Sequence, residues 1–137
     1  PQRVVVLMTD GMNAWNDQST NYLKSSYSAY GFFRNPDGSS VNARLPAANA
    51  NPSSSGQARA AIDAMTLEAC TNARNAGVTI YTVGFSVASD PIDTQGLSVL
   101  RSCAGNDSQF FVATDSTTID EVFQKIARSI GQLRLSM

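Results

Sequence analysis

The chain has 137 residues, a net charge of -1, a hydrophobic content of 42% and a charged content of 15%. This length predicts a single domain over residues 1–137, and the apolar fraction is sufficient for a buried core. The balanced charge argues against nucleic acid or an anionic membrane surface as a partner. The chain has no histidine, which excludes the commonest zinc ligand and every mechanism that needs a Ser–His or Cys–His pair.

The first predicted element is a strand at Val4–Met8, an unbroken apolar run that is rich in β-branched residues. Such a run is typical of a strand that is buried on both faces of a parallel sheet. Thr9, Asp10 and Gly11 follow it, which places Asp10 at the carboxyl end of a strand, where open α/β sheets bind ligands. The alternative is that Asp10 only opens a turn, because Asp and Gly are common turn residues.

Residues 13–56 are predicted to form a long irregular insertion, because Asn, Ser, Gly and Pro are frequent there. Connections of this length without regular structure are uncommon in compact domains and are often functional. The mixture of Tyr and Asn resembles an adaptable recognition surface. The candidate partner-binding residues are Trp15, Tyr22, Tyr27, Tyr30 and Phe32. The alternative is that these aromatic side chains pack back onto the rest of the protein.

Regular structure is predicted to resume near Gln57 with a helix that ends before Gly77, followed by a strand at Val78–Phe85. A short helix at about Thr94–Cys103 and a strand at Gln109–Ala113 are expected next. The alternation of strands and helices indicates an α/β fold with three layers and a mainly parallel sheet.

The last predicted element is a helix with an apolar stripe from Ile119 to Leu133. Thr118 and Glu121 match a capping box, so the helix is expected to begin at Thr118. Two cysteines, Cys70 and Cys103, lie on two different predicted helices. They are either two buried thiols or one disulfide, and a composition that is common in exported proteins favours the disulfide.

Three segments resemble the second half of a von Willebrand factor type A domain: Val4–Asn13, Asn75–Phe85 and the closing helix. The resemblance is closer to the carboxyl-terminal region of the tight-adherence (Tad) pilus-assembly proteins, which are bacterial envelope proteins, and it rests further on Leu100–Ala104. It covers most of the chain outside residues 13–56. It implies an incomplete, Rossmann-like von Willebrand factor type A fold, of which this chain is the carboxyl-terminal part.

Type A domains typically hold a divalent cation, usually Mg²⁺, with oxygen ligands at the carboxyl end of the sheet. Of the ligands in that pattern, only the Asp of the Thr-Asp-Gly loop has a counterpart here, Asp10. The resemblance therefore implies a partial metal-ion-dependent adhesion site. Mg²⁺ is expected only in an intact parent domain, and no cofactor is expected for this chain by itself.

The resemblance implies a non-enzymatic adhesion or scaffold module of the periplasm or cell envelope. It would act in pilus assembly through contacts with other pilus-assembly or envelope proteins, and residues 13–56 would be its partner-facing surface. The alternative is a hydrolase or transferase of an α/β fold that uses Asp10 as nucleophile or base. The absence of histidine and of a nucleophile elbow makes that alternative less favourable.

The chain begins at Pro1 instead of Met, and we expect it to be a piece of a longer polypeptide whose membrane anchor lies outside these residues. In the family order, a missing first strand would lie beside Val4–Met8 and leave this apolar strand with an unpaired edge. Unpaired edges favour pairing with another chain. We therefore expect self-association through Val4–Met8, or else a separate fragment that retains the missing half.

Overall fold

The computed structural model describes residues 3–18, 20–35, 45 and 52–135, with side chains up to residue 131. The described residues divide into two compact units. We call Pro1–Met12 together with Ala69–Met137 the sheet unit, and Asn13–Glu68 the loop unit. The boundary differs from the expected insertion at 13–56, because the first two thirds of a long helix belong with the loop.

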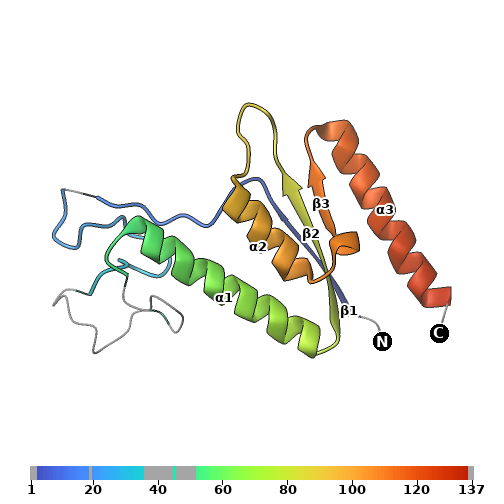
Figure 1. Ribbon diagram of the computed structural model, residues 1–137, viewed down its shortest axis with the longest axis horizontal. Coiled ribbons are helices and arrows are strands. Elements are labelled where there is room, and N and C mark those ends of the chain that lie inside the picture. Colours follow the sequence, from blue (N-terminus) through green and yellow to red (C-terminus); the bar gives the residue numbers. More distant parts are fainter. Residues whose placement is uncertain (1–2, 19, 36–44, 46–51, 136–137) are drawn as a thin grey trace. The chain divides into compact units, whose positions relative to one another are not determined.

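The sheet unit contains a three-stranded parallel sheet in the order β1-β2-β3 (Figure 1). The strands are β1 (Arg3–Thr9), β2 (Val78–Phe85) and β3 (Phe110–Ala113). The register between β1 and β2 runs without interruption along the whole of β1. All three strands lie where they are predicted, because β-branched and aromatic runs favour extended backbone.

Different helices cover the two faces of the sheet. α3 (Ser116–Leu135) packs on β2 and β3. The buried cluster on that face consists of Tyr81, Val83, Ala113, Val122 and Ile126. α2 (Thr94–Ala104) packs on the opposite face, where the Thr82 hydroxyl donates to the Leu100 carbonyl at 2.9 Å. The predicted three-layer α/β architecture is therefore confirmed, and it is compatible with a partial Rossmann-like fold.

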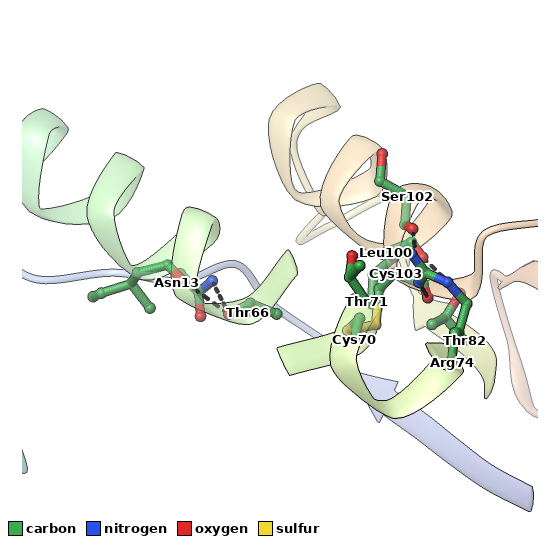
Figure 2. Close-up of a disulfide and its surroundings, with 10 residues drawn as sticks. Asn13, Thr66, Cys70, Thr71, Arg74, Thr82, Leu100, Ser102 and Cys103 are labelled. Atoms are coloured by element: carbon green, nitrogen blue, oxygen red, sulfur yellow. Dashed lines mark hydrogen bonds between the residues drawn. A yellow bond between two sulfur atoms is a disulfide. The ribbon is translucent and has the colours of Figure 1, made fainter. Parts of the chain in front are cut away.

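A disulfide between Cys70 and Cys103 joins α1 (Ser55–Asn75) to α2 (Figure 2). The two Cα atoms are 5.1 Å apart, and both cysteines are buried. The Arg74 guanidinium reinforces the junction by donating to the Ser102 carbonyl at 3.2 Å and to the Cys103 carbonyl. Of the two states expected for the cysteines, the structure has the disulfide.

β1 is an edge strand, and the prediction that it is buried on both faces is wrong. The side chains from Val5 to Met8 expose between 38% and 51% of their surface. Among the described residues, β1 has a neighbouring strand on one side only. A continuous apolar run predicts a strand, but the number of its neighbours determines its burial.

α3 begins at Ser116, earlier than the predicted capping box at Thr118 and Glu121. The Asp115 carboxylate accepts a hydrogen bond from the Thr118 backbone N–H at 2.8 Å and therefore caps the helix. This bond, together with a second from the Thr118 hydroxyl, lowers the pKa of Asp115. α3 therefore begins directly after Asp115.

Loss of the disulfide is expected to lower the free energy of unfolding by about 3–4 kcal/mol, because the crosslink restricts the unfolded chain. Urea denaturation of the oxidised protein and of the Cys70→Ser/Cys103→Ser variant, followed by circular dichroism, measures the difference. The reduced wild type is the matched control and should unfold with the double variant. Equal midpoints for the oxidised protein and the variant would contradict the expectation.

Asp115 is expected to make folding sensitive to acid. Its pKa is lower in the folded protein than the ordinary value of 3.8, so the unfolded state takes up the proton first. The stabilisation is present above about pH 4 and is lost as the pH falls through the folded pKa. The Asp115→Asn variant should lose less stability than wild type between about pH 4 and pH 2. Urea midpoints measured across this range test it, with Asp120→Asn on the same helix as the control; parallel curves for Asp115→Asn and wild type would refute it.

Candidate functional site

The loop unit has a small core of its own. It is formed by side chains of the loop and of the first half of α1: Trp15, Phe33, Leu45, Ala58 and Ala61. Trp15 is 3% exposed, and its ring meets the Phe33 ring edge-on at 5.7 Å. Its indole N–H donates to the Ser26 carbonyl at 3.0 Å. Trp15 is therefore a core residue. It does not lie on an exposed surface, as the prediction of a partner-binding role requires.

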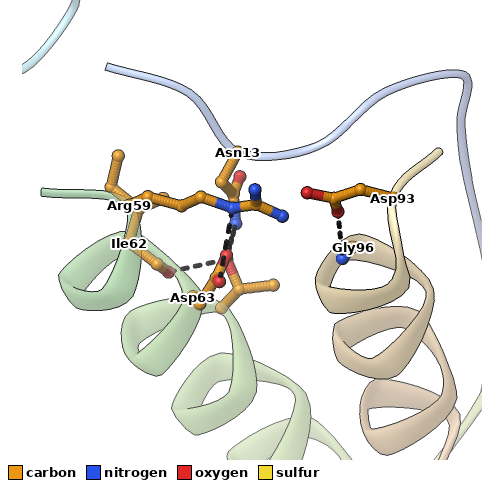
Figure 3. A network of polar contacts seen from close by, with 7 residues as sticks. Asn13, Arg59, Ile62, Asp63, Asp93 and Gly96 are labelled. Carbon is orange, nitrogen blue, oxygen red and sulfur yellow. Dashed lines mark hydrogen bonds and ion pairs between the residues drawn. The ribbon is translucent and has the colours of Figure 1, made fainter. Parts of the chain in front are cut away.

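Polar contacts fasten the start of the loop to α1 (Figure 3). The Asn13 amide donates to the Asp63 carboxylate at 2.8 Å and to the Thr66 hydroxyl at 3.3 Å. Asp63 is buried, and its carboxylate lies 3.9 Å from Arg59 Nε one helical turn away. A buried carboxylate is costly unless it has such partners. The contacts of Asn13 with Asp63 and Thr66 therefore hold the start of the loop against α1.

Tyr22 stands on a turn that the Asn21 side chain closes. The Asn21 amide donates to the Gln18 side chain at 2.8 Å and to the Ser25 carbonyl at 2.7 Å, and its oxygen accepts from the Ser25 N–H at 3.3 Å. Lys24 completes the turn in a left-handed conformation with φ of 54°. Tyr22 is 82% exposed, so the turn presents its ring to solvent.

Tyr30 stands on a second turn. Ser28 and Gly31 exchange two backbone hydrogen bonds across it, each 2.9 Å long. Tyr30 is 54% exposed and Tyr27 is 77% exposed. Phe32 is partly buried, and its ring packs against the Tyr27 ring with 5.3 Å between the centroids. Phe32 therefore packs against the exposed Tyr27 ring and is itself less exposed than that tyrosine.

We call Tyr22, Tyr27 and Tyr30 the tyrosine loop. Each of these tyrosines combines a large apolar ring with a hydroxyl that can donate or accept a hydrogen bond. A tyrosine loses little conformational freedom on binding, because it has only two side-chain torsions. The hydrogen-bonded turns hold the backbone beneath Tyr22 and Tyr30. Chemically, the arrangement is suited to contact with a protein surface.

Asp10 lies in an exposed bend at the carboxyl end of β1, as predicted. Thr9 closes this bend, because its hydroxyl accepts from the Gly11 N–H at 3.1 Å. Within the described residues, no group of three or more His, Cys, Asp or Glu side chains is placed to hold a metal ion. Mg²⁺ prefers several oxygen ligands, and a single exposed carboxylate does not fit it. The role of Asp10 as a metal ligand stays a prediction.

A groove between α2 and β3 was not predicted from the sequence. It has a volume of about 350 Å³ and is lined by Thr94, Leu97, Ser98, Arg101, Phe110 and Val112. The Arg101 guanidinium lies 5.1 Å from the centre of the Phe110 ring, and Arg101 Nε lies 3.5 Å from an Asp107 carboxylate oxygen. The α2 residues of the groove recur every three or four positions, so they lie on one face of the helix. The local sequence does not show which strand packs against that face.

Comparison of the chain with protein-family models, curated proteins and solved structures found no match. The relation to von Willebrand factor type A domains and to tight-adherence proteins therefore stays a prediction from sequence motifs. In the part of the chain that the structure describes, no helix combines the length and the apolar character needed to cross a membrane.

The core of the loop unit yields a stability prediction. Phe33 is fully buried against Trp15, so Phe33→Ala is expected to destabilise the loop unit by about 3–5 kcal/mol. The exposed control Tyr22→Ala should change stability by less than about 0.5 kcal/mol. Trp15 is the only tryptophan, so its fluorescence during urea unfolding reports this unit directly. Equal midpoints for the two variants would show that the loop has no such core.

Proposed function

We propose that the protein is a non-enzymatic adhesion or scaffold module of the bacterial envelope that acts in the assembly of a tight-adherence pilus. It works by protein–protein contact, and the tyrosine loop is the contact surface. The observation that carries the proposal is the exposure of three tyrosines between residues 22 and 30, two of them on hydrogen-bonded turns. Exposed tyrosines on a supported backbone are typical of recognition surfaces.

The disulfide supports the envelope as the compartment. Disulfides persist in oxidising environments such as the periplasm and are rare in the cytosol. Cys70, in the last part of α1 that belongs to the sheet unit, is joined to Cys103 on α2, so the bond is part of the fold of that unit. The low content of charged side chains points in the same direction, since it is common in exported proteins.

The environment of Asp10 favours a binding role over an enzymatic one. General acid–base chemistry needs a partner group that can exchange protons near the reacting atoms. Histidine is the most frequent such group, and the chain has none. The bend that carries Asp10 is exposed and is closed by the Thr9 hydroxyl, which is the arrangement of an ordinary turn.

The test is made in the organism that encodes the chain. Deletion of the gene is expected to abolish surface pili, counted by electron microscopy, together with adherence to a solid surface. Complementation with the wild-type gene should restore both. Complementation with the Tyr22→Ser/Tyr27→Ser/Tyr30→Ser variant should not restore them, because the three rings supply the contact area.

The matched control is Phe123→Ser, which removes a 44% exposed aromatic ring from α3 in the other unit. This variant should restore pili, and immunoblots should show that both variants accumulate to wild-type levels. Normal pili after deletion of the gene would overturn the proposed function. Loss of pili after deletion, with full rescue by the triple variant, would instead overturn the role of the tyrosine loop alone.

A further inference from the structure

The outer edge of β1 lacks the features that normally keep an edge strand from pairing. Among the described residues no strand lies beside it. The register along β1 is regular, without a bulge, and the run Val4–Met8 contains no charged residue and no proline. Natural edge strands are usually shielded by charges, prolines, bulges or covering elements. The backbone N–H and C=O groups on this edge are therefore able to form another ladder.

Both faces of β1 are accessible together with its edge. Successive side chains of a strand point to opposite faces. Val5 and Leu7 lie on one face, where they are 47% and 38% exposed. Val6 and Met8 lie on the other, where they are 39% and 51% exposed. A pairing strand would consequently gain side-chain contacts on both faces in addition to the backbone hydrogen bonds.

The charges at the ends of β1 favour a second copy of the same strand in the antiparallel direction. Arg3 begins the strand, and Asp10 follows its last residue. An antiparallel copy brings the Arg3 end of each strand to the Asp10 end of the other. A parallel copy would instead place like charges side by side, which is unfavourable.

We propose that two copies of the chain pair antiparallel through the outer edges of β1, with Val6 of one copy opposite Val6 of the other. Two-fold symmetry requires one residue to face its own counterpart, because directly opposed side chains must lie on the same face of the sheet. With Val6 at the centre, Val5 faces Leu7 and Val4 faces Met8, so every pair within Val4–Met8 is apolar, and Arg3 faces Thr9.

The neighbouring symmetric registers are less favourable, because of the residues that they place opposite each other. If Leu7 faced itself, Val4 would lie opposite Asp10, and if Val5 faced itself, Arg3 would lie opposite Leu7. Both registers place a charge against an apolar side chain. The Val6 register joins the two three-stranded sheets into one continuous sheet. This inference goes beyond the pilus role and does not depend on it.

The experiment uses the purified, oxidised chain in sedimentation velocity and equilibrium runs over a range of concentrations. Wild type is expected to form a dimer. Val6→Lys places two ammonium groups opposite each other at the two-fold axis and is expected to weaken dimerisation about tenfold or more. The matched control is Val112→Lys, because Val112 is 40% exposed on β3, at the other edge of the sheet. It should dimerise like wild type.

A crosslinking measurement keeps the proposal testable if Val6→Lys fails to fold. Under mild oxidation the Val6→Cys variant should form a disulfide-linked dimer, whereas Val112→Cys should not. Several outcomes would overturn the proposal: a wild type that stays monomeric at every concentration, a dimer that Val6→Lys leaves unchanged while the variant is folded, or crosslinking at residue 112 in preference to residue 6.

Discussion

β2 is held on both faces and along both edges, and the sheet unit depends on this strand. Tyr81 and Val83 lie in the cluster beneath α3, while Thr82 and Gly84 face α2. The Thr82 hydroxyl is fully buried and donates to the Leu100 carbonyl, so this polar group is satisfied inside the sheet unit. At Gly84 an added Cβ would lie 3.1 Å from Leu100, which leaves little room for any other residue. Because neighbouring residues of the strand point to opposite faces, β2 determines which helix covers each face.

β1 and β2 have similar sequence patterns but different environments. The sequence therefore predicts that both are strands, but it does not predict how deeply each is buried. The strands and helices of the sheet unit could be predicted, since each depends on a local run of residues. Burial of Val4–Met8 could not be predicted, because it depends on neighbours contributed by distant parts of a polypeptide. The start of α3 was misplaced for a related reason. Asp115 and Thr118 are both capable caps, and the end of β3 brings the chain into the helix at Asp115.

Composition predicts an irregular, aromatic segment at residues 13–56, but composition alone does not separate its core residues from its surface residues. Trp15 is buried in one cluster with Ala58 and Ala61, small residues on a helix far along the chain. The three candidate tyrosines of the loop are exposed, whereas Trp15 and Phe33 are buried. A polar group on the ring does not separate the two sets, because the Trp15 indole N–H is buried with the Ser26 carbonyl as its partner and Tyr81 of the sheet unit is buried too. Burial depends instead on packing against residues far along the chain, such as Ala58 and Ala61, and local composition does not contain that information.

The two proposed contact surfaces consist mainly of uncharged groups, and the charges at the ends of β1 only favour one direction of pairing. The edge of β1 offers backbone hydrogen bonds and aliphatic side chains, and the tyrosine loop offers rings with neutral hydroxyl groups. Specificity at such surfaces comes from register and shape, since electrostatic steering contributes little between neutral groups. Pairing through β1 would give each assembly two tyrosine loops. A partner that repeats along a filament could engage both, and the second contact would then form at a high effective concentration. Weak contacts of single tyrosine loops would in this way become a stable attachment to a repeating surface.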